Sequence, residues 1–169
     1  MHSPEQVVEF LKQQKLILTT AESCTAGLMA SLLADVPGCG SVLESGYVVY
    51  APQAKQRCLG VRPETIERFG LTSEEVAREM ALGALRVSGG TIAIANNGVA
   101  DDDTEEAAGV QCFAWALSLG DRQVVISETA RFDGDRSGIR IAAARYGLGR
   151  LPHCHRQLLE QADAAVDTA

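Results

Sequence analysis

The sequence predicts a single α/β domain in which a mixed β-sheet is flanked by helices. Short apolar, β-branched runs alternate with segments whose apolar residues recur at helical spacing. Near the end of the chain, two longer β-type runs meet at a Gly-Asp pair, residues 120–121, which is typical of a hairpin turn. Alternating strands and helices favour parallel strand pairs, and the hairpin adds antiparallel ones. Because a chain of 169 residues suits one domain and no linker or repeat interrupts it, residues 1–169 are assigned to that domain.

Cap and turn signals set the expected ends of the helices. A capping box with Pro4 at the first helical position starts one helix, and a second such pattern at residues 72–75 starts another. Gly149 and Pro152 are expected to split the last helix. The Ala- and Asp-rich tail, residues 161–169, is expected to fray. The expected strands are residues 16–20, 43–50, 91–95, 110–117 and 123–132. The expected helices are residues 4–14, 28–33, 52–59, 63–69, 72–88 and 136–160.

The charge balance disfavours several classes of main partner. Fifteen Lys and Arg residues against 22 Asp and Glu residues give a net charge of −7, whereas DNA, RNA and anionic membranes are bound by basic faces. No apolar run reaches the roughly 18 residues that a membrane span needs. The N-terminal residues lack the basic start and apolar stretch of a signal peptide. We therefore expect a cytoplasmic protein that binds neither nucleic acid nor membrane.

The five cysteines are expected to be free thiols. They are odd in number, irregularly spaced and form no CxxC pair, which is not the pattern of a disulfide framework or a zinc site. The run His153-Cys154-His155 looks like a metal-binding pattern, but residues two apart do not share a helix face. The acidic run of residues 101–103 lacks the glycine-centred spacing of a calcium loop. We expect no metal site.

Two loops that follow expected strands carry groups suited to catalysis. In open α/β sheets, ligands bind beyond the strand ends, in loops that lead into helices. At residues 23–27, hydroxyl groups and free amides at a helix start suit a phosphate or a developing oxyanion; alternatively, Ser23 and Thr25 only cap the helix. Lys55 lies one turn into a helix and near Tyr50. A buried lysine has a lowered pKa and can act as the base for a serine; the alternative is an ordinary surface lysine.

A third loop carries two arginines. Residues 133–136 read Asp-Gly-Asp-Arg, and Arg140 follows one turn after Arg136. The two guanidinium groups share a helix face and are able to hold a phosphate or a carboxylate. The alternative is that they form ion pairs with Asp133 or Asp135.

Five segments of the chain carry a family resemblance. They are TAESCTAG at residues 20–27, ESGYVVYAPQAK at 44–55, LGV at 59–61, GLTSEEVAREMALGA at 70–84 and FDGDR at 132–136. Together they resemble the CinA C-terminal-domain family, whose characterised members are nicotinamide-nucleotide amidases. The resemblance implies one α/β domain, commonly a homodimer, with no metal or organic cofactor. It also implies hydrolysis of the carboxamide of nicotinamide mononucleotide, with release of ammonia, by a serine nucleophile and a lysine base.

The resemblance implies roles for individual residues. Lys55 would be the base with Tyr50 as its neighbour, and Ser23 would assist or polarise. Arg136 would contact the small-molecule, nucleotide-like substrate or shape its pocket. The further substrate-binding candidates are Thr25, Gly27, Gly46, Asn97, Gly98 and Arg140.

The chain departs from the family pattern at the nucleophile. The family's nucleophilic serine lies in a Gly-Ser-Ser segment between the first two motifs, and counting back from residues 44–46 puts Gly40 at its position. A nucleophile is present one residue away on either side, as Cys39 or Ser41. Positioning errors near an ångström can cost about a hundredfold in rate.

Two further departures concern expected ligand contacts. Where the family reads T/S-G-I-A-G-P and then K-P-V-G, this chain has Asp101 and Asp102 in place of Gly-Pro and Glu106 in place of the lysine. These carboxylates would repel a phosphate dianion if the loop faces it. Ala26 replaces the first glycine of a Gly-Gly pair, and its Cβ restricts close approach of a ligand to the backbone.

Two hypotheses follow from the sequence. In the first, the protein is an amidohydrolase that uses Ser41 or Cys39 with Lys55, acting on nicotinamide mononucleotide or a less acidic relative. In the second, it keeps the fold and the dimer but has lost the reaction, and acts as a ligand-binding or structural protein. Because the nucleophile position and the loop at residues 101–106 depart together, the second is favoured for the standard nucleotide.

Overall fold

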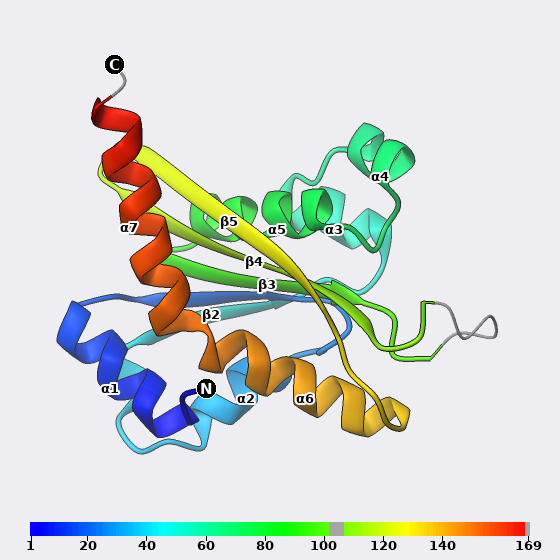
Figure 1. Cartoon of the computed structure of the whole chain (residues 1–169), viewed down its shortest axis with the longest axis horizontal. Coiled ribbons are helices and arrows are strands. Elements are labelled where there is room, and N and C mark those ends of the chain that lie inside the picture. The colour runs from blue at the N-terminus through cyan, green and yellow to red at the C-terminus, as the bar shows by residue number, and fades with distance from the viewer. Residues whose placement is uncertain (102–106, 168–169) are drawn as a thin grey trace.

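A computed structural model of the chain describes residues 1–101 and 107–167, which form one α/β domain. The strands are β1 (Leu18–Glu22), β2 (Leu43–Val48), β3 (Ile92–Gly98), β4 (Val110–Leu119) and β5 (Arg122–Arg131). The helices are α1 (Pro4–Gln14), α2 (Leu28–Ala34), the 3-10 turn η1 (Cys39–Ser41), α3 (Pro52–Leu59), α4 (Pro63–Phe69), α5 (Glu74–Val87), α6 (Arg136–Gly149) and α7 (Leu151–Asp167). The predicted fold class, a mixed sheet flanked by helices, is confirmed (Figure 1).

The sheet is parallel on one side and antiparallel on the other. Its strand order is β2-β1-β3-β4-β5. β1 runs parallel to both β2 and β3, whereas β3–β4 and β4–β5 pair antiparallel, so the predicted hairpin is present. With this topology β1, β2, β3 and β5 all end at the same side of the sheet, at the right in Figure 1. We call this side the carboxyl edge; its loops are residues 22–27, 49–52, 98–101 and 131–136.

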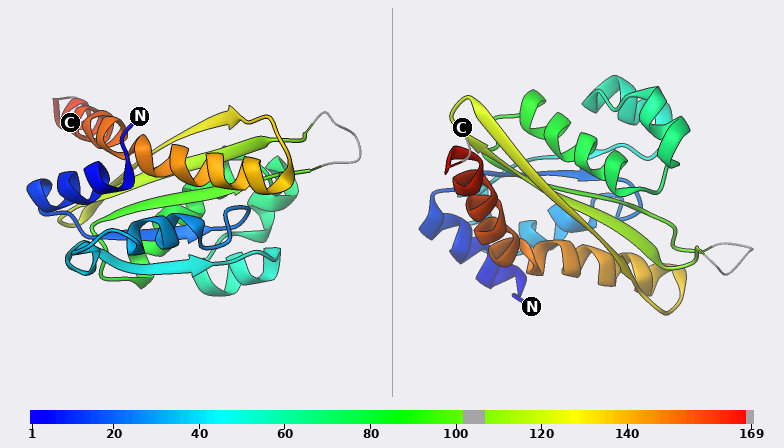
Figure 2. Two further views of the ribbon diagram at one scale, coloured as in Figure 1. Left: turned by 90° about the horizontal axis from the view of Figure 1, so that it is seen from below. Right: turned by 45° about the horizontal axis from the view of Figure 1, so that its top comes forward.

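Helices cover both faces of the sheet. In Figure 1, α3, α4 and α5 lie above it, and α1, α2 and α6 lie below it. Seen from below, the three lower helices lie side by side, while α7 packs against β4 and β5 (Figure 2). Each layer has its own apolar core: Phe113 and Trp115 belong to the lower one, and Met80 and Leu59 to the upper one. No helix in the described part of the chain is long and apolar enough to cross a membrane.

Some element boundaries differ from the sequence prediction. α5 begins at Glu74, two residues later than expected, because the Ser73 hydroxyl accepts from Val76 N–H and makes Ser73 the N-cap. The last helix is split between Gly149 and Leu151, as predicted. The prediction that the tail frays after residue 160 is wrong for residues 161–167, since α7 continues to Asp167 with Ala162 buried.

One close contact in the upper layer fixes the spacing of α3 and α5. A Cβ built on Gly83 of α5 would lie 2.1 Å from the carbonyl oxygen of Leu59, the last residue of α3. Arg86, one turn further along α5, donates to the same carbonyl at 2.7 Å. The two helices can approach this closely only because Gly83 has no side chain.

We predict that Gly83→Ala destabilises the protein. The added methyl group has to push α3 away from α5, and overpacking of this kind costs about 2 kcal/mol, which lowers Tm by about 4–8 °C in a chain of this size. Gly40→Ala is the matched control, because a Cβ at Gly40 meets nothing within 4 Å. Thermal unfolding followed by circular dichroism measures both changes. An unchanged Tm for Gly83→Ala would contradict this account of the helix spacing.

Candidate active site

Lys55 and Ser23 meet at the carboxyl edge in a buried hydrogen bond. Ser23 directly follows β1, and Lys55 lies in the first turn of α3, which Pro52 begins. The Lys55 side chain is fully buried, and its Nζ donates to Ser23 Oγ at 2.9 Å. The same Nζ donates to the carbonyl oxygens of Val49 and Tyr50, both at 2.8 Å. All three hydrogens of the ammonium group therefore have acceptors, and every acceptor is a neutral oxygen.

Burial lowers the pKa of Lys55 from 10.5 to about 8. The cause is desolvation, because removal from water disfavours the charged form of an amine. A neutral Lys55 has a lone pair and can accept the proton of the Ser23 hydroxyl. Of the two alternatives drawn from the sequence, the buried lysine is correct and the surface lysine is wrong.

Glu22 holds the turn that carries Ser23. Its carboxylate is fully buried and accepts from the backbone N–H groups of Met29 and Ala30, at 2.9 and 3.1 Å, and from Thr20 Oγ1 at 2.9 Å. A carboxylate at a helix N-terminus satisfies free amides and interacts favourably with the helix dipole. Glu22 thus joins the end of β1 to the start of α2. The alternative that Ser23 and Thr25 cap α2 is wrong, since its N-cap is Gly27 with no side-chain cap.

A second polar group supports the turn from β3. The Asn96 side chain accepts from Thr25 N–H at 3.1 Å and donates to Gln111 Oε1 at 3.0 Å. Gln111 in turn donates to Val99 O at 3.2 Å. The sequence did not point to Glu22, Asn96 and Gln111, although Glu22 ends β1 and Asn96 follows the apolar residues of β3, where a buried polar side chain needs a partner.

Asn97 presents an unpartnered oxygen beside Ser23. Glu22 pairs with Asn96 in the β1–β3 register, and Ser23 N–H donates to Asn96 O at 2.9 Å, so Asn97 is the neighbour of Ser23 on the next strand. Both side chains lie on the upper face: that of Ser23 contacts Lys55 of α3, and Asn97 Nδ2 donates to Ser73 O at 3.2 Å, at the start of α5. Asn97 is 1% exposed, and its Oδ1 has no hydrogen-bond partner among the described residues.

An arginine and a tyrosine form the outer rim of the site. Arg136 Nη2 donates to Tyr50 Oη at 3.0 Å, and its Nη1 makes an ion pair with Asp101. The charge of Asp101 is the main cause that raises the pKa of Arg136. The expected alternative, pairing with Asp133 or Asp135, is not what forms, because Asp135 caps α6 by accepting from Gly138 N–H at 2.7 Å.

Arg140 holds the turn and does not reach the rim. It donates from Nε to Cys24 O at 2.9 Å and from Nη2 to Thr25 O at 3.5 Å. A cavity of about 370 Å³ lies beside the rim, between residues 100–101 and residues 131–136.

The glycines among the candidates have packing explanations. A Cβ on Gly46 would lie 3.0 Å from Thr20 Oγ1, where β2 packs against α2. A Cβ on Gly98 would overlap the Gln111 side chain at 2.3 Å. Gly27 adopts a positive φ of 92°, which favours glycine. Its neighbour Ala26 also has a positive φ, 47°, although it carries a side chain.

Within one chain, Ser41 and Cys39 are not brought together with Lys55. η1 precedes β2, whereas Lys55 follows β2, and six strand residues span roughly 20 Å. Ser41 Oγ donates to Gly38 O at 3.0 Å, and Cys39 Sγ to Ala34 O at 3.8 Å. These side chains lie at the opposite edge of the sheet, where Ser41 borders a cavity formed with the end of α1.

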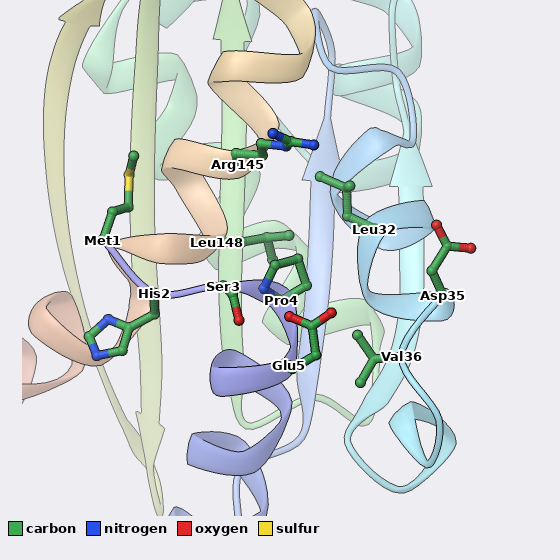
Figure 3. Close-up of a pocket in the computed structure, with 10 residues that line it drawn as sticks. All are labelled: Met1, His2, Ser3, Pro4, Glu5, Leu32, Asp35, Val36, Arg145 and Leu148. Carbon is green, nitrogen blue, oxygen red and sulfur yellow. The ribbon is translucent and has the colours of Figure 1, made fainter.

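A cavity of about 440 Å³ lies away from these groups (Figure 3). The N-terminal residues, α2 and α6 enclose it, and Figure 3 shows Glu5, Asp35 and Arg145 around it. It contains neither Lys55 nor Ser23. Among residues 1–101 and 107–167, no group of three or more His, Cys, Asp or Glu side chains is placed to hold a metal ion.

The chain is similar in sequence to CinA-type proteins. The family model described as the CinA C-terminal domain matches residues 2–155. The nicotinamide-nucleotide amidohydrolase PncC of Escherichia coli K12 is 38% identical over 154 residues, which cover 89% of this chain and 92% of that protein. A CinA-like protein of Chlorobaculum tepidum is 45% identical over 149 residues, 85% of this chain but 35% of that longer protein.

Solved structures give the same fold. The crystal structure of the competence/damage inducible protein CihA from Agrobacterium tumefaciens has a TM-score of 0.82 at 33% sequence identity. The match covers 89% of this chain and 92% of that one. A protein from Enterobacter asburiae, described as competence or damage-inducible, has a TM-score of 0.80 at 34% identity, over 89% of this chain and 97% of that one.

We predict that Ala26→Gly stabilises the protein. Ala26 has a positive φ of 47°, and the left-handed conformation costs a non-glycine residue about 1 kcal/mol, which glycine avoids. The gain corresponds to a rise in Tm of about 2–4 °C, measured by differential scanning calorimetry. Ala30→Gly, inside α2, is the control and should lower Tm. A fall in Tm for Ala26→Gly would mean that the turn is not strained at this residue.

We also predict that the buried Lys55 makes stability depend on pH. Its pKa is about 8 in the folded protein and 10.5 when unfolded, so between these values the unfolded chain binds more protons. The free energy of unfolding of the wild type, relative to Lys55→Met, should therefore rise from pH 8 to pH 10, by up to about 1.4 kcal/mol per pH unit. Urea unfolding at several pH values measures this difference. A difference that stays constant would show that the lysine has an ordinary pKa.

Proposed function

The chain belongs to the CinA C-terminal domain family, and we propose that it is an amidohydrolase of the nicotinamide-nucleotide type. It hydrolyses the carboxamide of nicotinamide mononucleotide, or of a less acidic relative, to the carboxylate and ammonia. The observation that carries the proposal is the buried pair of Lys55 and Ser23, joined by a hydrogen bond of 2.9 Å. The Escherichia coli relative is named a nicotinamide-nucleotide amidohydrolase, and the match covers 92% of its length, which supports this substrate class.

Ser23 is the proposed nucleophile. Neutral Lys55 accepts the hydroxyl proton as Ser23 Oγ attacks the carboxamide carbon, giving a tetrahedral intermediate. Lys55 then donates that proton to the amide nitrogen, ammonia leaves, and an ester to Ser23 remains. Lys55 then deprotonates a water molecule that attacks the ester, and it returns that proton to Ser23 Oγ as the carboxylate product is released. A lysine with a pKa of about 8 suits both directions of proton transfer near neutral pH.

Two neighbouring groups suit the carboxamide substrate. The backbone N–H of Cys24 directly follows the nucleophile, the position from which many hydrolases stabilise the oxyanion. The unpartnered Oδ1 of Asn97 is able to accept a hydrogen bond from the substrate's NH2 group. Flipping the Asn97 amide would set its oxygen against Ser73 O, so the carbonyl end is the one left without a partner.

This proposal places the chemistry differently from the family pattern. The resemblance puts Gly40 at the position of the family's serine, and Ser41 and Cys39 lie at the other edge of the sheet. The second candidate function is a binding protein without catalysis, which the glycine at position 40 favours. The homodimer and the cytoplasmic location expected from the sequence stay predictions.

We predict that Ser23→Ala and Lys55→Met each lower kcat/KM for ammonia release at least about 100-fold, since each removes one half of the nucleophile–base pair. Ser41→Ala and Cys39→Ala are the matched controls and should stay within about twofold of wild type. A coupled ammonia assay on purified proteins, with circular dichroism to verify folding, gives the comparison.

Two results would redirect the assignment. Full activity in Ser23→Ala combined with loss in Ser41→Ala or Cys39→Ala would move the nucleophile back to the η1 segment. A folded wild type that binds the substrate but releases no ammonia, beside an active family member, would favour the binding protein.

A further inference from the structure

At the rim of the site, the guanidinium group of Arg136 is paired with a carboxylate of the same chain. Arg136 is half exposed, and a free arginine at the mouth of a site is a strong attractant for phosphate. Here the carboxylate of Asp101 occupies its Nη1 side, and Tyr50 Oη accepts from its Nη2. Asp101 comes from the loop after β3 and Arg136 from the start of α6, so the pair joins two loops of the carboxyl edge.

Tyr50 connects this ion pair to the proposed reaction centre. Its carbonyl oxygen accepts from Lys55 Nζ at 2.8 Å, and its hydroxyl accepts from Arg136 Nη2 at 3.0 Å. One tyrosine side chain therefore separates the base from the arginine. For a nicotinamide ring whose carboxamide lies at Ser23, Tyr50 is the residue that links the reaction centre to the ion pair.

The cavity beside the pair is acidic. Three carboxylates line it, those of Asp101, Asp133 and Asp135, against the guanidinium groups of Arg131 and Arg136. Arg140, one turn along α6, directs its Nε and Nη2 to backbone carbonyls. A phosphate dianion that approaches Arg136 must pass or displace a carboxylate, which disfavours it.

We propose that Asp101 makes the protein specific for the nicotinamide nucleoside, which lacks the 5′-phosphate. This inference rests on the proposed function. The nucleoside is a cation, because its pyridinium ring is positively charged, whereas the mononucleotide adds a phosphate dianion and is a net anion. An acidic cavity attracts the first and repels the second. Asp101 thus takes the place on Arg136 that the phosphate of a nucleotide substrate would fill.

The test compares ammonia release from nicotinamide riboside and from nicotinamide mononucleotide. Wild type should show a kcat/KM at least about tenfold higher for the riboside, as expected for like charges a few ångströms apart. Asp101→Asn should raise kcat/KM for the mononucleotide about tenfold, mainly through a lower KM, and reduce it for the riboside. Arg136→Ala, added to Asp101→Asn, should abolish the gain. Asp121→Asn is the control, because Asp121 is exposed in the β4–β5 turn at the other edge.

The outcomes separate this inference from the proposed function. Preference for the mononucleotide in wild type, with the same preference in Asp101→Asn, would overturn the inference while the amidohydrolase assignment stands. If neither compound is hydrolysed, the amidohydrolase assignment fails, and calorimetric titration decides the inference. The inference is supported if wild type binds the riboside more tightly than the mononucleotide and Asp101→Asn reverses this order. It is overturned if wild type binds both equally or binds the mononucleotide more tightly.

Discussion

The arrangement of the carboxyl edge depends on one buried ammonium group. Lys55 has no exposed surface, and a cation removed from water is stable only if its donors are satisfied. It finds its acceptors on two different loops, Ser23 after β1 and the carbonyls of Val49 and Tyr50 after β2. The requirement for three acceptors therefore fixes the relative positions of both loops and of α3. These acceptors do not fully replace the water that burial removes, and this desolvation lowers the pKa of the amine.

A buried glutamate holds the opposite face of the same turn. Glu22 precedes Ser23 and points to the lower layer, where it holds the first amides of α2. Alternation along β1 thus sends the carboxylate down and the serine hydroxyl up from adjacent residues. Asn96 and Asn97 repeat this division on β3, the first supporting the turn and the second facing the lysine side. The two strands give the turn its rigidity and the nucleophile its direction.

The sequence predicted most of the fold because its signals are local. The capping box at Ser3, the Gly-Asp turn and the break after Gly149 act over a few residues, and the structure has all three. The site was harder because its contacts are distant in sequence. Arg136 pairs with Asp101, 35 residues away, and not with its neighbours Asp133 and Asp135, one of which is committed to a helix cap. Ser41 was a candidate because of its place in the family motif, although the strand expected at residues 43–50 already separates it from Lys55. The burial of Lys55 and Glu22 likewise follows from tertiary packing, which periodicity does not encode.

Through the contact between Gly83 and Leu59, the packing of the upper layer affects the proton affinity of Lys55. α3 carries Lys55 at its first turn and ends at Leu59, whose carbonyl is held by α5. Any local opening between the two helices would admit water to the amine and return its pKa toward that of a free lysine. The pKa of Lys55 is therefore coupled to local opening between α3 and α5, at a contact more than one helical turn away from the lysine. Hydrogen-exchange rates of the α3 amides and the titration of Lys55 should consequently vary together.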